Sequence, residues 1–252
     1  MDIQHCTALV TGGNRGIGEA FVRALLAAGA RKVYVGTRHL PDAEHLLRAH
    51  PDQIVPVALD VTDPAQIAAA ATTCTDIALL VNNAGAFLNQ TLMGAPDLTA
   101  ARLEMEVNYF GPLQLCRALA PALRAQGGGA ILNVLSAGAL VAVPGMGGYS
   151  PSKFAARAAT NCIRAELAAQ GTQVTALIVG SVDTRMAAHV EGRKEHPDAI
   201  AQAGLAALRK RQDEVDTDIM AVEMRAALAR DPKALERSLA RQLGATRLHT
   251  GR

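Results

Sequence analysis

A tyrosine and a lysine stand four positions apart in the segment YSPSK, at residues 149–153. In a helix, positions i and i+4 lie on one face, so the phenol of Tyr149 and the ammonium of Lys153 would point at the same volume. A nearby cation favours the phenolate form of tyrosine, and a phenol with a lowered pKa can exchange a proton near neutral pH. Taken alone, the pair is better explained as a surface tyrosine beside a solvated lysine, so its meaning depends on the rest of the chain.

The composition is that of a single large α/β domain. The chain has 252 residues, of which 50% are hydrophobic, and a formal net charge of +2 with its basic residues spread along the sequence. No basic face for nucleic acid is expected, and no apolar run reaches the roughly 18 residues of a membrane span. The four cysteines show neither CxxC spacing nor a paired histidine cluster, which argues against a metal site and a disulfide framework. We therefore expect a cytoplasmic protein that binds no metal, nucleic acid or membrane.

Apolar runs of strand length alternate with longer segments of helical spacing. This alternation predicts a parallel sheet with helices on both faces. The predicted strands are 7–12, 32–37, 53–60, 77–84, 129–136 and 174–180, and the predicted helices are 17–29, 41–50, 64–73, 98–125 and 152–170. Pro112 falls inside the longest helix and removes a backbone donor there, so we expect a kink or break near Gly111.

The first predicted strand runs directly into the segment TGGNRGIG, at residues 11–18. Glycines at a strand–turn–helix junction let the backbone turn sharply and approach a phosphate, and the N-terminus of the helix offers free N–H groups and a positive dipole. Glycines also serve turns and tight helix–strand packing alone. Their position here favours a nucleotide site, with contacts from Gly12, Asn14, Arg15, Gly16, Ile17 and Gly18.

Further motifs follow the predicted strands in a fixed order. They are Asp60, NNAG at 82–85, Asn108, Ser136 and YSPSK. With the glycine segment, they make residues 7–185 resemble the short-chain dehydrogenase/reductase family. The resemblance implies a single catalytic domain over residues 1–252, built on a Rossmann-type doubly wound parallel sheet, with its ligand beyond the carboxyl ends of the strands.

The resemblance also assigns four residues to chemistry. Hydride transfer between a nicotinamide and a carbonyl carbon requires a proton at the carbonyl oxygen, and Tyr149 fits that acid/base role. Lys153 would supply the cation that favours the phenolate and would hold the nicotinamide ribose. Ser136 would donate a hydrogen bond to the substrate oxygen. Asn108 would hold a water that links Lys153 to solvent.

Two arginines bear on the choice of cofactor. NAD-specific sites place an acidic residue after the second strand, whereas this chain has Arg38 there and no carboxylate before Asp42. The planar guanidinium of Arg38 suits a 2′-phosphate, and Arg15 matches a second basic position of NADP-using relatives. We therefore expect NADP(H) rather than NAD(H), although both arginines are also compatible with solvated surface charges.

The remaining cofactor contacts are implied by the resemblance alone. Asp60 either contacts the adenine amino group or caps the helix that begins after DVTDP, and one residue can do both. The NNAG turn would bring the backbone close to the cofactor. The implied contacts at these and later positions are Asp60, Val61, Asn83, Ala84, Gly85, Tyr149, Lys153, Val182 and Thr184.

The sequence departs from the family pattern around the sixth strand and in the tyrosine segment. Val179 stands where many relatives have a proline before Gly180, which leaves the start of that loop less rigid. Pro151 lies between Tyr149 and Lys153, where a first helical turn tolerates it because its missing N–H would be unpaired anyway. The predicted site is therefore retained.

The C-terminal third contains a predicted lid and an atypical tail. Residues 185–211 are charged, are broken by glycine and proline, and correspond to the substrate lid of relatives. We expect His189 and His196 to be exposed lid residues rather than ligands or a second base. Residues 212–218 offer at most a short edge strand, and the tail 219–252 is expected to be helical with a break at RDPK.

Two functions are compatible with these residues. The first is an NADP(H)-dependent carbonyl reductase that acts on a ketone or aldehyde and runs in reverse on a secondary alcohol, with an NAD-dependent alcohol dehydrogenase as a variant. The second is a non-catalytic dinucleotide-binding sensor or scaffold. The intact acid/base set favours the enzyme. The predicted apolar wall of its substrate pocket comprises Phe87, Leu88, Leu140, Val143, Met146 and Met186.

A homodimer or homotetramer is also expected. The helix predicted at 152–170 carries Phe154, Ala155, Ala158 and Ile163, and this low-profile apolar surface resembles the family's helix-to-helix dimer contact.

Overall fold

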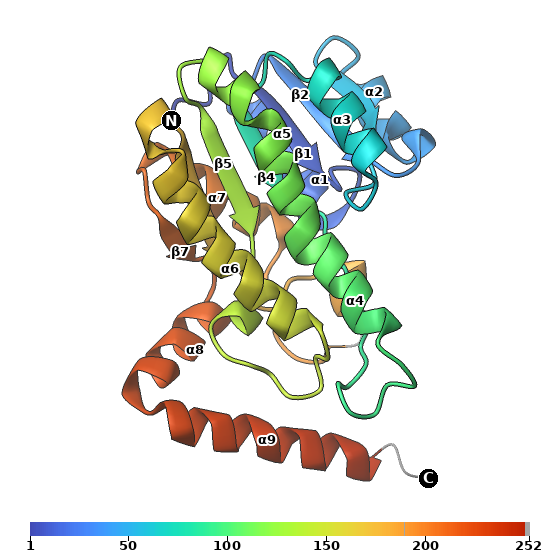
Figure 1. Cartoon of the computed structure of the whole chain (residues 1–252), viewed down its shortest axis with the longest axis vertical. Helices are drawn as coiled ribbons and strands as arrows, with labels where there is room; N and C mark the ends of the chain where they lie inside the picture. Colours follow the sequence, from blue (N-terminus) through green and yellow to red (C-terminus); the bar gives the residue numbers. More distant parts are fainter. Residues whose placement is uncertain (189, 250–252) are drawn as a thin grey trace.

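A single parallel sheet of seven strands forms the centre of the computed structural model, which describes residues 1–188 and 190–249 (Figure 1). The strands are β1 Thr7–Thr11, β2 Lys32–Thr37, β3 Ile54–Ala58, β4 Leu79–Asn82, β5 Ala130–Val134, β6 Gln173–Ile178 and β7 Glu214–Asp216. Their order, β3-β2-β1-β4-β5-β6-β7, reverses between β1 and β4. This is the Rossmann-type doubly wound sheet, and the predicted fold class is confirmed.

Helices cover both faces of this sheet. The α-helices of the described residues are α1 Gly16–Ala27, α2 Glu44–Ala49, α3 Pro64–Thr73, α4 Thr99–Met105, α5 Gly111–Ala125, α6 Tyr149–Glu166, α7 Pro197–Arg209, α8 Ile219–Arg230 and α9 Pro232–His249. α1, α2 and α7 share one core with the sheet, and α3, α5 and α6 share the core on the opposite face, which is turned to the viewer in Figure 1. Every residue of β1 and β6 is buried, as a parallel sheet between two helix layers requires.

The long helix predicted at 98–125 is divided by a π-helical turn, Glu106–Phe110. Pro112 has no N–H to donate to the carbonyl of Asn108, and the N–H of Gly111 bonds instead to the carbonyl of Glu106, five residues earlier. A side chain at position 111 would also crowd the loop after β3, because an added Cβ would lie 2.8 Å from the carbonyl oxygen of Val61. The break predicted near Gly111 is therefore confirmed.

The segment YSPSK lies at the very start of α6. The helix begins at Tyr149 rather than at the predicted residue 152, and Pro151 is its third residue. The first four N–H groups of a helix have no intrahelical partner, so the proline costs no hydrogen bond at this position. The predicted tolerance of Pro151 is confirmed, and the predicted helix start is wrong by one turn.

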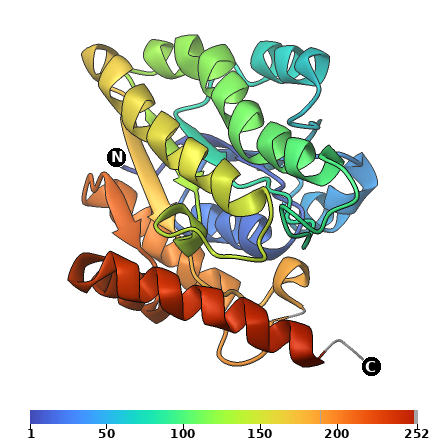
Figure 2. The same ribbon diagram turned by 60° about the horizontal axis from the view of Figure 1, so that its bottom comes forward.

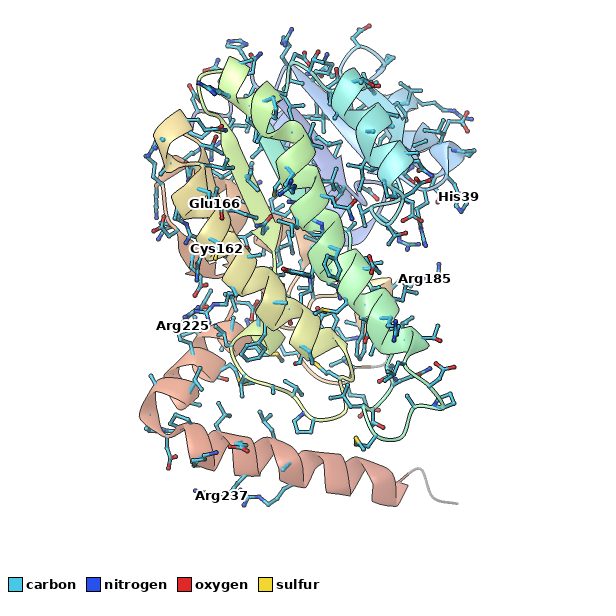
Figure 3. All side chains as sticks on the ribbon, in the orientation of Figure 1. His39, Cys162, Glu166, Arg185, Arg225 and Arg237 are labelled. Carbon is cyan, nitrogen blue, oxygen red and sulfur yellow. The ribbon has the colours of Figure 1, made fainter. Side chains whose placement is uncertain are left out.

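Of the residues predicted on the outward face of α6, Ile163 lies in the core instead. Phe154 is 39% exposed and Ala158 is also exposed. Figure 3 shows Cys162 and Glu166 further along this helix, and both are exposed. Ile163 is 9% exposed and packs into the core against the sheet, so it does not belong to the outer surface.

The segment predicted as a lid divides into two parts. α7 occupies residues 197–209 and belongs to the core, because Leu205 and Leu208 are buried and an added Cβ on Gly204 would lie 2.7 Å from the ring of Phe21 on α1. Residues 185–188 and 190–196 lie outside this helix, and the backbone of Glu195 is hydrogen-bonded to the backbone of Ser181 and Asp183. His196 caps α7 by accepting a hydrogen bond from the N–H of Asp198 at 3.3 Å, and its side chain is 70% exposed, as predicted. His189 lies outside the described residues.

The tail follows the prediction closely. β7 is a three-residue edge strand beside β6, and α8 and α9 meet at Asp231, within RDPK. Figure 1 shows α9 lying across the end of the molecule toward which β5 points, and Figure 2 shows α9 with that end turned forward. Among the described residues, no helix combines the length and the apolar character needed to cross a membrane.

Candidate active site

Ser136, Tyr149 and Lys153 meet beyond the carboxyl end of β5. Ser136 follows the strand by two residues, and its hydroxyl lies close enough to the phenol of Tyr149 to lower the pKa of that phenol. The same Oγ accepts a hydrogen bond from the N–H of Gly138 at 3.1 Å, which fixes its position. The Nζ of Lys153 lies 5.6 Å from the centroid of the Tyr149 ring. The three side chains therefore form one cluster.

Lys153 is a buried cation. Lys153 is only 5% exposed, and its Nζ donates a hydrogen bond of 3.1 Å to the carbonyl of Val134 at the end of β5. Burial penalises the charged form and lowers the pKa of Lys153 to about 8. The lysine thus changes its charge near physiological pH.

The pKa of Tyr149 is raised from its ordinary value, mainly because burial disfavours the phenolate. The hydrogen bond from Ser136 lowers this pKa, and the negative charge of Glu104 raises it. The expectation that the neighbouring lysine lowers the pKa of Tyr149 is therefore wrong: desolvation outweighs the favourable contacts. The phenol therefore stays protonated at neutral pH, which is the form that a proton donor needs.

Asn108 is held by protein groups rather than left free for water. Its Oδ1 accepts a hydrogen bond from the N–H of Ala86 at 2.9 Å, and its Nδ2 donates to the carbonyl of Ala86 at 2.9 Å and to Oγ of Ser152 at 3.0 Å. A cavity of about 20 Å³ lies beside it, bounded among others by Lys153 and Asn82. The buried Oδ1 of Asn82 has no hydrogen-bond partner among the described residues. A cavity of this size has room for one water.

The glycine loop between β1 and α1 is shaped for an anion. Gly12 and Gly16 have positive φ values of 60° and 55°, and a Cβ on Gly18 would overlap the carbonyl oxygen of Gly12. Arg15 precedes the first turn of α1 without capping it, which leaves the N–H groups of that turn available. Free N–H groups and the positive end of the helix dipole together fit a phosphate. Asn14 and Ile17, also on this loop, are half-buried.

The loop after β4 is fastened to the glycine loop. The N–H groups of Asn83 and Ala84 both donate to Oγ1 of Thr11, at 3.0 Å and 2.9 Å, and Nδ2 of Asn83 donates to the carbonyl of Thr11 at 2.9 Å. The next residue, Gly85, lies directly beside Asn108, because an added Cβ would be 3.3 Å from Oδ1 of Asn108. The backbone of this motif can therefore approach a ligand closely.

Asp60 does not cap the helix that follows it. The N-cap of α3 is Asp63, whose carboxylate accepts hydrogen bonds from the N–H groups of Ala65 and Gln66. Oδ1 of Asp60 accepts hydrogen bonds from the N–H and the hydroxyl of Thr62, at 2.9 Å and 2.8 Å. The capping alternative for Asp60 is therefore wrong. Within the described part of the chain its Oδ2 accepts no hydrogen bond, and the neighbouring Val61 is buried.

The end of β2 carries exposed positive charge. Arg38 and Arg15 are both exposed, and within residues 1–188 and 190–249 neither forms an ion pair. Asp42, the first acidic residue after the strand, lies in the exposed 3-10 turn Leu40–Ala43. Figure 3 shows His39, next to Arg38, on the same side of the molecule as Arg185, which follows β6.

The loop after β6 returns to the glycine loop. Val182 is buried and forms an isolated bridge with Glu195, while the methyl group of Thr184 faces Gly16, where an added Cβ would lie 3.3 Å away. The start of the loop, which we expected to be less rigid without a proline, is held by Asp218. Its Oδ2 accepts a hydrogen bond from the N–H of Gly180 at 2.6 Å.

Leu140 does not belong to the predicted wall of the substrate pocket. Leu140 is 4% exposed and packs with Ala156 and Ile178 in a small core. Leu88 and Met186 are exposed, at 39% and 44%. Phe87 meets the Tyr149 ring edge-on, with 5.2 Å between the ring centroids.

Sequence reasoning missed two buried carboxylates that touch this region, Glu104 and Asp218. Both accept hydrogen bonds from backbone N–H groups of distant loops. The sequence contains one indication for Glu104, because it precedes Asn108 by four residues and would lie on the same helical face. Asp218 carried a second, because it stands before an apolar helical segment as an N-cap does.

The comparisons with known proteins decide the family. A sequence model described as short chain dehydrogenase matches residues 6–195. The chain belongs to the short chain dehydrogenase family. A solved short chain dehydrogenase from Burkholderia cenocepacia J2315, in complex with NADP, is 45% identical and superposes with a TM-score of 0.89 over 95% of this chain and 99% of that one.

Curated short chain dehydrogenases are more distant. A 3-alpha-(or 20-beta)-hydroxysteroid dehydrogenase from Mycobacterium bovis is 35% identical over 183 residues, which cover 71% of this chain and 70% of that protein. Dehydrogenase/reductase SDR family member 7B of Mus musculus is 31% identical over 195 residues. That match covers 73% of this chain and spans only 60% of the mouse protein.

Proposed function

We propose that this protein is an NADP(H)-dependent carbonyl reductase, which transfers a hydride between the cofactor and a ketone or aldehyde and runs in reverse on a secondary alcohol. The observation that carries the proposal is the cluster of Ser136, Tyr149 and the buried Lys153, whose Nζ lies 5.6 Å from the centroid of the Tyr149 ring. A proton donor, an oxygen-binding hydroxyl and a cation then act on one carbonyl oxygen.

Each residue has a separate task in the reduction. The nicotinamide supplies the hydride when it is bound. Tyr149 gives its proton to the carbonyl oxygen, and Ser136 donates a hydrogen bond to the same oxygen. Lys153 stabilises the phenolate that forms and helps to hold the cofactor ribose. The water-sized cavity between Asn82, Asn108 and Lys153 supports the next step, in which a proton returns to the site through water.

NADP(H) is supported by the charge at the adenosine end. The exposed guanidinium of Arg38 follows β2, where an acidic residue would repel a 2′-phosphate, and Arg15 stands beside the glycine loop. The similar Burkholderia cenocepacia protein was solved with NADP, which agrees with this choice. The free Oδ2 of Asp60 is suited to accept a hydrogen bond from the adenine amino group.

An apolar substrate is supported by the residues around the phenol. Phe87 contacts Tyr149, and Leu88 and Met186 expose apolar surface on the neighbouring loops. We propose that residues 185–196 act as the lid over this substrate. The hydroxysteroid dehydrogenase activity of the Mycobacterium bovis relative is the same type of reaction on an apolar skeleton.

The test compares the wild type with Tyr149→Phe, which removes the proton donor and keeps the ring. NADPH oxidation is followed by absorbance with a panel of ketones and aldehydes. The variant should lose about a hundred- to ten-thousandfold in turnover, the contribution of a positioned acid, with almost unchanged NADPH affinity in a fluorescence titration. Near-normal turnover of the variant would exclude Tyr149 as the acid. Tight NADPH binding by the wild type without turnover of any compound would favour the sensor.

A further inference from the structure

Glu104 and Asn108 form two matched contacts between the same pair of loops. Asn108 binds Ala86 on one side and Ser152 on the other. Glu104, one helical turn earlier, accepts a hydrogen bond from the N–H of Leu88 at 2.7 Å, and its other carboxylate oxygen packs against Gly148. Both side chains are 2% exposed. The helical segment therefore holds the loop after β4 and the start of α6 at two levels.

The contacts of Glu104 lie on both sides of the proposed proton donor. Gly148 is the residue immediately before Tyr149, and Leu88 is the residue immediately after Phe87, whose ring packs against the Tyr149 ring. Gly148 is also closely packed, since an added Cβ would lie 2.6 Å from Cα of Ala101 and 2.9 Å from Oε2 of Glu104. Movement of the carboxylate would thus release the backbone beneath the phenol and the ring against it.

Glu104 also brings a charge to the phenol. The charged groups that face Tyr149 are Lys153, on α6, and Glu104, on α4, while Ser136 contributes a neutral hydroxyl from the loop after β5. Burial raises the pKa of Glu104 and its two backbone donors lower it. At the alkaline pH at which a tyrosine ionises, this carboxylate is negative and opposes the phenolate.

We propose that Glu104 is a positioning residue for Tyr149, whose buried carboxylate holds the backbone on both sides of the phenol. The proposal rests on the proposed role of Tyr149 as the acid.

The first experiment measures the ionisation of Tyr149 directly. The chain has no tryptophan and only three tyrosines, so the near-ultraviolet absorbance of tyrosinate can be titrated, and subtraction of the same protein with Tyr149→Phe isolates Tyr149. Glu104→Gln should move the transition to lower pH. Glu106→Gln, the same change on the exposed face two residues away, should leave it in place. Circular dichroism restricts the titration to the folded range.

The second experiment tests the backbone contacts. Glu104→Ala removes the acceptor of the Leu88 N–H group, so amide hydrogen exchange should accelerate about ten- to a hundredfold at Leu88, as expected for a lost hydrogen bond to a charged group. Glu106→Ala is the control. If the Tyr149 transition of Glu104→Gln does not move, or if no transition is seen, the charge of Glu104 has no role at the phenol. Unchanged hydrogen exchange in Glu104→Ala overturns the positioning role. Neither readout requires turnover, so an absence of reductase activity would refute the proposed function separately.

Discussion

Lys153 is the residue whose titration should limit the reduction at high pH. Its pKa is lowered to about 8 by burial, whereas the pKa of Tyr149 is raised above its ordinary value of 10.0. As pH rises through 8, the lysine therefore loses its proton while the phenol keeps its own. The cation that stabilises the developing phenolate is then lost, although the proton donor remains.

We expect kcat/KM for NADPH to fall above a pH of about 8, by about tenfold for each further unit. This quantity reports the pKa values of the free enzyme, which is the state that the structure describes. The measurement is a pH profile of NADPH oxidation with one saturating carbonyl compound. A profile that stays flat up to the ordinary pKa of tyrosine would show that the charge of Lys153 is not required.

Arg38 should decide between the two nicotinamide cofactors. Arg38→Asp replaces a cation that suits a 2′-phosphate by an anion that suits a 2′-hydroxyl, so the ratio of kcat/KM with NADPH to that with NADH should fall by at least about a hundredfold. Arg48→Asp, an exposed arginine on α2, is the control for the same charge change. A wild type that already prefers NADH, or an unmoved ratio in Arg38→Asp, would disprove the assignment.

At the residue scale, the sequence reveals groups that act through their own chemistry better than groups that act through the backbone. Tyr149, Lys153 and Ser136 stand at spacings that are informative in the sequence itself, and the fold brings them into one cluster. Glu104 and Asp218 bind the N–H groups of loops that are distant in sequence. Every residue except proline offers such an N–H group, so no pattern of residue types identifies these partners.

At the element scale, apolar runs bounded by polar turns predicted the strands well, because a buried parallel strand must be apolar throughout. β2 and α3 have the predicted bounds, and the signals that end them are local. α7 was not predicted, because its charged ends and Gly204 suggested a loop. Its glycine is instead the contact that lets α7 lie against Phe21 of α1, a tertiary reason that the local sequence does not show.

The attachment of α8 should weaken at acidic pH. Arg157, from α6, and Arg225, from α8, both bind Glu214 on the edge strand β7. Burial raises the pKa of Glu214, but the hydrogen bonds and charges of the two arginines outweigh it, and the net pKa is lowered. Stability from a lowered carboxyl pKa is present above the unfolded value of roughly 4.3 and is lost as pH falls through the folded value.

We therefore expect urea unfolding to become easier below a pH of about 4.3 in the wild type. Arg225→Gln should destabilise the protein at neutral pH by about 1 kcal/mol, since its partly exposed ion pairs with Glu214 and Asp216 are screened by solvent, and should reduce the acid sensitivity. Lys233→Gln, which removes an exposed ion pair on α9, is the control. Equal stability of Arg225→Gln and the wild type at neutral pH would contradict this account of the tail.

At the scale of the whole molecule, the exposed apolar residues of α6 and those of α8 form two candidate contacts for self-association. One follows the outer face of α6, where Phe154 is exposed, and continues to Phe110 on the π-helical turn that packs against α6. The other lies at the start of α8, where Ile219 and Val222 are exposed. The small residues beside Phe154, such as Ala158, allow the helices of two copies to approach closely, whereas α8 is followed at once by α9.

We expect light scattering at micromolar concentration to give the mass of a homodimer or homotetramer, held by the α6 face. Phe154→Arg places a charge at the centre of that contact, where it would be buried without a partner, and should shift the mass toward the monomer. Ile219→Arg, the matched change on α8, should leave the mass unchanged. A monomeric wild type would refute the assembly, and dissociation by Ile219→Arg alone would assign the contact to the tail.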